Sequence, residues 1–229
     1  MFDRIARRYD LLNRLMSFGL DERWRRLLVK NLFDEEARSR AANKEGYAIL
    51  DVATGTADVA LAIAAAYPTA HVTGLDPSRE MLAVGHVKVA KLGLVERVTL
   101  TEGDAQALPY KDGQFAASCI SFGIRNVPDR MLGLRELARV TQRDGRVLVL
   151  ELNEPEGLLA PFAKLHVHHI VPWLGAWLSG AKEYRYLQES IEAFPSPAVF
   201  AGMMETAGLR VETAIPLAFG SAHLYVARA

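Results

Sequence analysis

A β-type run that ends in a turn of small residues and passes directly into a helical pattern most constrains what this chain can fold into. Residues 48–52 read Ala-Ile-Leu-Asp-Val, residues 53–57 are all small, and apolar residues then recur at helical spacing from residue 58. Strand, tight turn and helix in this order form the first unit of a βαβ fold. Such a turn offers backbone N–H groups and a helix N-terminus to a ligand. An ordinary βα turn has the same pattern, so the turn alone leaves a ligand site and a plain connection both open.

Strands and helices alternate along most of the chain after this turn. We expect strands at residues 48–53, 70–75, 97–102, 115–121 and 146–152, and helices at 58–67, 78–92 and 129–142. A further helix at 196–207 and strands at 209–215 and 222–227 follow. Regular alternation predicts the α/β class, with a doubly wound, Rossmann-like parallel sheet flanked by helices. Ligands of such sheets bind beyond the carboxyl ends of the strands.

The turn departs from the dinucleotide-binding fingerprint G-x-G-x-x-G. Gly55 aligns with the first glycine, but Ala57 stands where the central glycine lets a pyrophosphate approach, and the acid Asp58 follows it. A pyrophosphate would be repelled by that acid. S-adenosylmethionine carries a sulfonium and an ammonium group and no phosphate, so nearby acids favour it. The turn therefore fits a nucleoside without phosphates better than a dinucleotide.

Two acids follow the next strands at the ligand-binding edge. Asp76 ends the second strand, where an acid can accept both ribose hydroxyls of an adenosine, although acids are also common at helix N-termini. Asp104 and Ala105 follow the third strand, and a carboxylate there could accept the adenine amino group. With Asp51 and Gly55 of the turn motif, these residues form a candidate cofactor site that is more specific than any one of them.

Composition excludes several partners. Lys plus Arg equals Asp plus Glu, at 27 each, so no overall field favours nucleic acid. Cys119 is the single cysteine, which excludes a disulfide framework and indicates a reducing, cytoplasmic compartment. No signal peptide or apolar run of transmembrane length is present. Basic residues crowd the first thirty positions, which is typical either of a solvated helix face or of a basic arm at the inner face of an anionic membrane.

Two segments stand apart from the alternation within one expected domain, 1–229. Residues 1–45 are expected to form an N-terminal helical arm, in which Tyr9 could line a pocket. Residues 153–195 are rich in large apolar side chains and predict a helical lid over the site, with an extra packing layer as the alternative. The lid holds three histidines, at 166, 168 and 169, whose spacing fits no common zinc pattern. We therefore expect no metal.

Four motifs carry a resemblance to a known family. They read Phe2-Asp3-x-Ile5-Ala6-x-x-Tyr9-Asp10-x-x-Asn13, Leu50-Asp51-Val52-Ala53-Thr54-Gly55-Thr56, Ser121-Phe122-Gly123-Ile124-Arg125-Asn126-Val127 and Tyr184-x-Tyr186-Leu187-x-x-Ser190-Ile191. In this order they resemble the class I S-adenosylmethionine-dependent C-methyltransferases of quinone biosynthesis, which methylate demethylmenaquinone and 2-methoxy-6-polyprenyl-1,4-benzoquinol. The resemblance implies a seven-stranded sheet with an antiparallel last strand, and a polyprenylated quinol as substrate. It implies cofactor contacts at Thr56, Asp76, Asp104, Ala105 and Ser121.

The chain also departs from this family. Ala57 stands where the family usually has glycine, so cofactor affinity could suffer if residue 57 needs a positive φ or a close contact. Asn153 lies in a stretch where the family favours Glu-Phe-Ser, and residues 221–224 replace a more apolar run.

The third motif supplies the candidate catalytic residues. Methylation of a ring carbon is favoured when the neighbouring hydroxyl is ionised, and the charge of Arg125 can stabilise that phenolate or orient a water that removes its proton. A guanidinium stays protonated, so Arg125 is no base itself. Asn126 could hydrogen-bond the same oxygen, and Tyr9 could orient the substrate. A surface salt bridge is the alternative for Arg125.

Alternatives for the whole chain are a methyltransferase of another apolar small molecule and a non-catalytic cofactor-binding scaffold of a quinone-synthesis assembly. Association of this chain into a homo-oligomer stays open.

Overall fold

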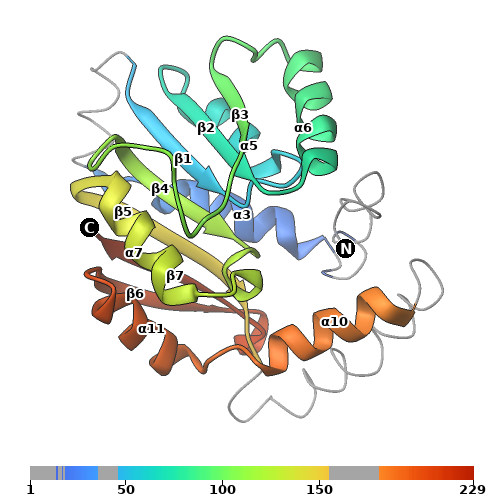
Figure 1. Ribbon diagram of the computed structural model, residues 1–229, viewed down its shortest axis with the longest axis vertical. Helices are drawn as coiled ribbons and strands as arrows, with labels where there is room; N and C mark the ends of the chain where they lie inside the picture. Colours follow the sequence, from blue (N-terminus) through green and yellow to red (C-terminus); the bar gives the residue numbers. More distant parts are fainter. Residues whose placement is uncertain (1–13, 15–16, 18, 36–45, 155–180) are drawn as a thin grey trace.

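The computed structural model describes residues 14, 17, 19–35, 46–154 and 181–229, without the side chains of residues 181–185. Its centre is a seven-stranded sheet in the order β3-β2-β1-β4-β5-β7-β6 (Figure 1). The strands are β1 (Ala48–Val52), β2 (His71–Asp76), β3 (Val98–Glu102), β4 (Phe115–Ser121), β5 (Thr141–Leu152), β6 (Arg210–Leu217) and β7 (Ala222–Arg228). Strand β7 runs antiparallel to both of its neighbours, and the other pairings are parallel. This confirms the predicted α/β class and the antiparallel last strand.

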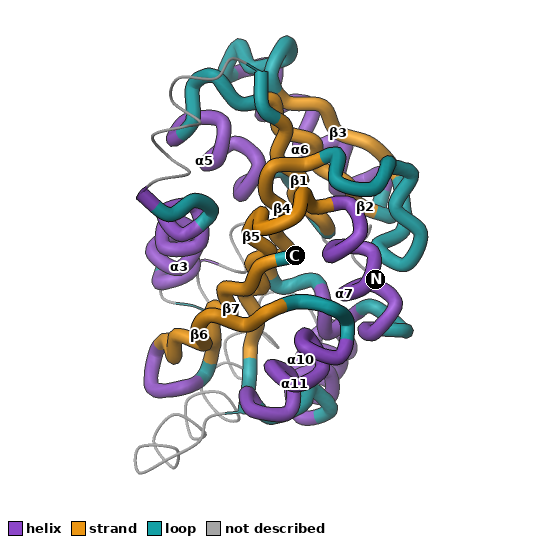
Figure 2. Tube along the Cα trace, turned by 90° about the vertical axis from the view of Figure 1, so that its left-hand side faces the viewer, coloured by secondary structure: helices purple, strands orange, loops and turns teal. Residues whose placement is uncertain are grey.

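Helices cover both faces of the sheet, and each face has its own hydrophobic core. The described helices are α3 (Leu20–Asn31), α5 (Asp58–Ala66), α6 (Arg79–Lys91), α7 (Arg130–Val140), α10 (Ala181–Glu192) and α11 (Pro197–Thr206), with short 3₁₀ turns η2 (Ile124–Asn126) and η4 (Ala218–Gly220). Figure 2 shows α3 and α5 on one side of the sheet and α7 and α11 on the other. Apolar side chains of α3, α5 and α6 share one buried cluster, and those of α7 and α11 share the second.

Local sequence features fix several helix ends where they were predicted. The Ser78 hydroxyl accepts a hydrogen bond from the Met81 amide at 3.2 Å, which makes Ser78 the N-cap of α6. Gly208 follows α11 with a φ of 95°, the left-handed conformation in which glycine ends a helix. Gly19 precedes α3 with a φ of 75°, which is also left-handed.

The connection between α7 and β5 was predicted wrongly. We expected the helix to continue to residue 142 and the strand to begin at residue 146, but α7 ends at Val140 and β5 begins at Thr141. Thr141 pairs with Phe115, and the register then shifts. Asp144 has a φ of 63°, and Gly145 lies so close to its neighbours that an added Cβ would be 2.7 Å from two carbonyl oxygens. The Asp-Gly pair therefore forms an irregularity inside a longer strand.

The arm and the lid lie largely outside the described residues. Of the expected arm, α3 packs Trp24 and Leu28 into the core, whereas Tyr9 is outside the described part. Of the expected lid, residues 153–154 and 181–195 are described, and the three histidines are not.

Within the described ranges, none of the helices combines the length and apolar character needed to cross a membrane.

Candidate functional site

The turn between β1 and α5 is held in an unusual backbone conformation. Ala53, Gly55 and Ala57 all have positive φ values, of 53°, 57° and 69°. Positive φ is costly for residues other than glycine, and such residues gather at functional sites. Ala57 is fully buried at the N-cap of α5. We expected cofactor affinity to suffer if residue 57 needed a positive φ, and Ala57 does adopt one.

Asp76 joins this turn to the start of α6. One carboxylate oxygen, Oδ2, accepts a hydrogen bond from the Gly55 amide at 2.8 Å, and Oδ1 accepts one from the Ser78 amide at 2.9 Å. The residue is nearly buried at the carboxyl end of β2. Two backbone amides therefore hold the carboxylate at the strand end, where parallel sheets bind their ligands. Both interpretations of Asp76, helix-terminal acid and ligand acceptor, fit its position.

Asp104 lies next to Asp76, as its place after the neighbouring strand predicted. The Gly103 amide donates to the main-chain oxygen of Asp76 at 3.2 Å, which brings the two strand ends together. The Asp104 side chain is exposed and accepts hydrogen bonds from the amide and side chain of Gln106 at 2.9–3.1 Å. Ala105 beside it is buried. The exposed Asp104 carboxylate can accept a hydrogen bond from an amino group on the edge of a flat ring, and the small Ala105 beside it leaves room for that ring.

Ser121 ends β4, the strand next to β1. Its hydroxyl is buried and has no hydrogen-bond partner in the structure. Buried polar atoms without partners are rare, and a ligand is one explanation for them. Phe122 follows with a φ of 56°, and an added Cβ on Gly123 would lie 2.4 Å from the Cβ of Ala53. The ends of β1 and β4 therefore approach closely, and glycine is required at residue 123.

Asp51 lies beneath the turn rather than on its surface. It is 1% exposed, and it accepts hydrogen bonds from the Thr54 hydroxyl at 2.6 Å and from the Cys119 thiol at 3.5 Å. Burial raises the pKa of the Asp51 carboxyl to about 7, although these hydrogen bonds oppose the shift. Burial also raises the pKa of the Cys119 thiol, so this cysteine is an unreactive part of the core. Asp51 is thus placed to hold the turn in shape from below.

Asp58 is not the isolated negative charge that the sequence suggested. Its carboxylate pairs with Arg25 of α3 and with Lys88 of α6, each at 2.6 Å. Its charge is therefore offset by two cations, which weakens the argument that it repels a pyrophosphate or attracts a cationic ligand. Sequence reasoning missed both partners because they lie 33 and 30 residues away, without any local spacing that pairs them.

Arg125 lies in η2, directly after β4, and forms a buried ion pair with Glu151 at the end of β5. Nη1 of Arg125 is 2.6 Å from Oε1 of Glu151 and also donates to the Phe122 carbonyl oxygen at 2.8 Å. The side chains are 6% and 0% exposed. Arg125 does form a salt bridge, but the bridge is buried, so the alternative of a surface salt bridge is wrong. The Arg125 Nε is buried and has no partner in the structure, so part of the guanidinium remains able to donate.

Asn126 connects the third motif to the fourth. Its Oδ1 accepts a hydrogen bond from the hydroxyl of Tyr186, on α10, at 3.1 Å. Its Nδ2 is 3.5 Å from the Phe122 carbonyl oxygen. Tyr186 is 40% exposed, and sequence reasoning gave it no role beyond its place in a motif. Of the three candidate catalytic residues, the structure brings Arg125 and Asn126 together.

Metal-binding groups do not gather anywhere in the described part of the chain: no three histidine, cysteine or acidic side chains there are placed to hold an ion.

Comparison with known proteins gives one consistent result. The ubiE/COQ5 methyltransferase family model matches residues 1–228. A "Ubiquinone/menaquinone biosynthesis C-methyltransferase UbiE" of Syntrophotalea carbinolica is 46% identical over 211 residues, which cover 92% of this chain and 84% of that protein. A "Demethylmenaquinone methyltransferase" of Thermus thermophilus is 44% identical over 228 residues, which cover 99% and 98%.

Solved structures agree on the fold. A SAM-dependent methyltransferase from Aquifex aeolicus aligns with a TM-score of 0.58 at 20% identity, covering 86% of this chain and 90% of its own. The mitomycin 7-O-methyltransferase MmcR aligns with a TM-score of 0.65 at 20% identity, covering 100% of this chain and 61% of its own.

Proposed function

The chain belongs to the ubiE/COQ5 methyltransferase family, and from this premise we propose that it transfers the methyl group of S-adenosylmethionine to a ring carbon of a polyprenylated hydroquinone. The relatives named above act, by their names, in menaquinone and ubiquinone biosynthesis. The observation that carries the proposal is the position of the two candidate subsites on one sheet edge. Strand β1 lies between β2, which ends at Asp76, and β4, which leads to Arg125.

The cofactor site we propose comprises Thr56, Asp76, Asp104, Ala105 and Ser121, together with Gly55 of the turn and Asp51, which is buried behind the turn. The unpartnered Ser121 hydroxyl and the place of the Asp76 carboxylate at the carboxyl end of β2 support this assignment, because S-adenosylmethionine has ribose hydroxyls and an ammonium group that can pair with such oxygens. When bound, it supplies an electrophilic methyl group. Acids and a hydroxyl, without a glycine-rich phosphate cradle, fit a nucleoside that has no phosphates.

Arg125 is the residue that we assign to the oxygen of the substrate. Transfer would break the bond from the methyl carbon to the sulfonium sulfur, leaving the thioether S-adenosylhomocysteine, and form a bond to a ring carbon. The hydroxyl ionises to make that carbon nucleophilic, the methylated carbon loses its ring proton, and the oxygen regains a proton, so one proton is released overall. An ordinary phenol has a pKa of roughly 10, so the site must favour the phenolate. The free Nε face of the Arg125 guanidinium can donate to that oxygen, and Asn126 can support it from the same turn. We assign the orientation of the substrate to Tyr9, on the resemblance alone.

The polyprenyl tail places the enzyme near a membrane. We propose one methyltransferase domain, 1–229, in which residues 1–45 form an arm and residues 153–195 form an apolar lid that receives the tail. The basic residues of the first thirty positions and the apolar surplus of the lid support peripheral attachment at the cytoplasmic face. A measurement of its mass in solution would show whether this chain associates with copies of itself.

The experiment that tests this function is incubation with labelled S-adenosylmethionine and demethylated menaquinol or ubiquinol precursors, each reduced in situ. Label transfer to a polyprenylated quinol is expected. Transfer only to other phenols would replace the substrate assignment, and cofactor binding without any turnover would favour the scaffold alternative. Arg125→Lys is the informative variant, since it keeps a cation beside Glu151 but loses the Nε donor. We expect it to bind S-adenosylmethionine normally and to lose turnover.

A further inference from the structure

We propose that Arg25, Asp58 and Lys88 act as positioning residues, and that helix α3 fixes the cofactor-binding turn through them. This inference rests on the proposed function, because it concerns the affinity of the same turn for S-adenosylmethionine. It adds three residues that lie outside the four sequence motifs.

The three side chains form a continuous series of contacts from α3 to the turn. On α3, Asp21 accepts from Arg25 at 3.2 Å. Arg25 donates through Nη1 to Oδ2 of Asp58 at 2.6 Å, and Lys88 donates through Nζ to Oδ1 of the same carboxylate at 2.6 Å. Lys88 also donates to the hydroxyl of Thr56 at 2.9 Å. Thr56 is the residue of the turn that the resemblance assigns to the cofactor, so the series ends at the ligand site.

Burial makes these contacts stronger than ordinary surface ion pairs. The side chains of Asp21 and Arg25 are 7% and 12% exposed, and those of Asp58 and Lys88 are 30% and 26% exposed. Exposed pairs contribute little because water and salt screen them, whereas partly buried pairs are screened much less. Lys88 also satisfies two acceptors at once, which fixes its otherwise flexible side chain. Asp58 is therefore a shared anchor and not an incidental surface charge.

The turn needs such an anchor because its own backbone is strained. Thr56 lies between Gly55 and Ala57, both in the left-handed conformation. Residues held in sparsely populated conformations persist only when the surrounding structure restrains them. Asp76 restrains the turn on one side through the Gly55 amide. Lys88 restrains it on the other side through Thr56, and α3 holds Lys88 in place through Asp58.

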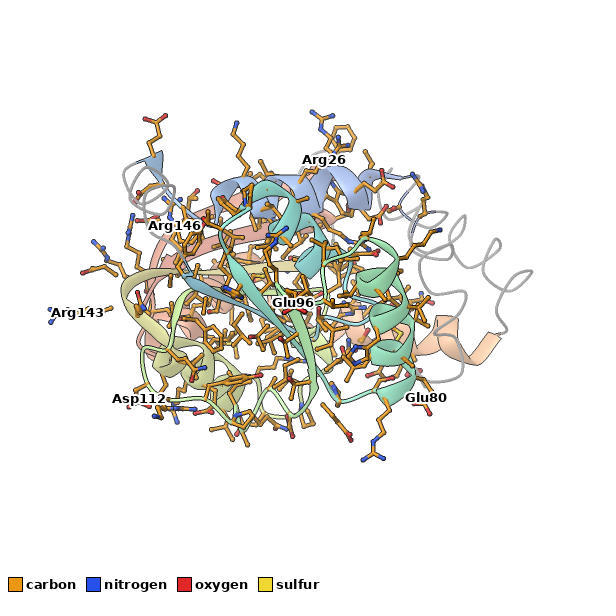
Figure 3. The ribbon with its side chains drawn as sticks, turned by 90° about the horizontal axis from the view of Figure 1, so that it is seen from above. Arg26, Glu80, Glu96, Asp112, Arg143 and Arg146 are labelled. Atoms are coloured by element: carbon orange, nitrogen blue, oxygen red, sulfur yellow. The ribbon has the colours of Figure 1, made fainter. Side chains whose placement is uncertain are left out.

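The neighbouring arginine on α3 shows that this arrangement is specific. Arg26 is exposed and points away from the fold (Figure 3). Its Nε donates only within its own helix, to the Glu22 carbonyl oxygen at 3.3 Å, among the contacts described for it. Arg25 and Arg26 thus differ by one position in the sequence, and only Arg25 faces the turn. They provide a matched pair of variants on the same helix.

A second matched control comes from Glu212, a carboxylate that also bridges two cations. It pairs with Arg146 and Arg228, which lie opposite each other at the other end of the sheet from the site. Removal of its charge breaks an ion-pair network of the same kind without touching the turn.

The test is the dissociation constant of S-adenosylmethionine, measured by calorimetry on the full chain, with a thermal melt for each variant. Asp58→Asn and Lys88→Gln should weaken binding roughly 5- to 20-fold, in the range typical of coupling between sites. Lys88→Arg should retain most of the affinity. Arg25→Gln, which cannot touch the cofactor turn directly, should also weaken binding, whereas Arg26→Gln and Glu212→Gln should leave it unchanged even where they lower the melting temperature.

The outcomes separate this inference from the proposed function. If the wild-type chain binds S-adenosylmethionine and both Arg25→Gln and Lys88→Gln bind it equally well, the positioning role is overturned and the function stands. If the wild-type chain itself does not bind S-adenosylmethionine, the proposed function fails and this inference fails with it. Should Asp58→Asn not fold, Arg25→Gln and Lys88→Gln carry the same test, because each leaves Asp58 with one cation.

Discussion

The guanidinium of Arg125 and the carboxylate of Glu151 form a buried ion pair that ties the turn after β4 to the end of β5. Besides the 2.6 Å contact to Nη1, Glu151 accepts hydrogen bonds from the amides of Arg125 at 3.2 Å and of Leu152 at 2.9 Å. The carboxylate is therefore well satisfied without any ligand. Its charge also compensates that of Arg125, so in the role that we propose Arg125 would act on a phenolate by local hydrogen bonding more than by net charge.

Glu151→Gln should destabilise the protein strongly, because it leaves the Arg125 guanidinium buried without a counter-charge. Breaking a buried pair in this way costs roughly 3–5 kcal/mol of unfolding free energy. Urea denaturation measures it. The control is Arg79→Gln, which breaks the exposed pair of Arg79 and Glu102 and should leave the unfolding free energy almost unchanged. Equal effects of the two substitutions would contradict the buried pair.

Ala57→Gly should be tolerated, in contrast to other buried alanines. Glycine loses a buried methyl group and gains freedom in the unfolded chain, but it also relieves the positive φ of 69°, and these effects offset each other to within about 0.5 kcal/mol. Ala64→Gly is the matched control, since Ala64 is equally buried but lies within α5. It should cost about 1–2 kcal/mol. Chemical denaturation gives the unfolding free energy of both variants. A larger loss of stability in Ala57→Gly than in Ala64→Gly would contradict the backbone strain at residue 57.

Features set by neighbouring residues could be predicted from the sequence. The alternation of strands and helices predicts the sheet. The helix ends at Ser78 and Gly208 also follow from the sequence, because capping depends on residues a few positions apart. The acids Asp76 and Asp104 could be placed together because parallel strands end at one edge. Each of these inferences uses only local chemistry and topology.

Pairings between distant residues could not be predicted. Arg125 and Glu151 are 26 residues apart, and no periodicity links them. The Arg25–Asp58–Lys88 series depends on how α3 and α6 pack on the same face, which the pattern of either helix leaves open. The wrong boundary at α7 has the same origin. Thr141 pairs with Phe115 of the adjacent strand, so the strand begins before the irregularity at Asp144 and Gly145.

Stability should depend on pH through Asp51. Burial raises the pKa of its carboxyl to about 7 in the folded protein, so the folded state binds a proton more tightly than the unfolded chain does. This contribution is complete below the unfolded pKa of roughly 4 and is lost as the pH rises through about 7. The loss should be on the order of 2–4 kcal/mol. The unfolding free energy, measured by denaturation at several pH values between 4 and 8, should therefore change less with pH in Asp51→Asn than in the wild type. An equally steep loss of stability in that variant would mean that another group is responsible for it.

Tyr186→Phe should impair use of the quinol without affecting the cofactor. The variant removes the donor to Asn126 Oδ1 and so leaves less restrained the side chain that we propose to support the substrate oxygen. Loss of one such hydrogen bond should change kcat/KM for the quinol about 2- to 10-fold. Ser190→Ala, on the same helix, removes a hydrogen bond that stays within α10 and should change neither constant. An altered KM for S-adenosylmethionine in Tyr186→Phe would count against this division of roles.

Asn153 and His223, two positions at which the chain departs from its family, contact each other and should be energetically coupled. Oδ1 of Asn153 is 3.2 Å from Nδ1 of His223, and the Tyr225 hydroxyl is 3.4 Å from the same oxygen. Both Asn153 and His223 are buried, so replacing either one removes a partner of a buried polar group and should cost about 1–3 kcal/mol.

A double-mutant cycle with Asn153→Ser and His223→Leu measures this coupling. The double variant should be less destabilised than the sum of the single variants, by about 0.5–3 kcal/mol, because the two substitutions remove the same contact. His223→Leu combined with Arg79→Gln should be additive, since Arg79 pairs with Glu102 beside β3, at the opposite edge of the sheet. Additivity in both cycles would mean that the contact between Asn153 and His223 contributes nothing to stability.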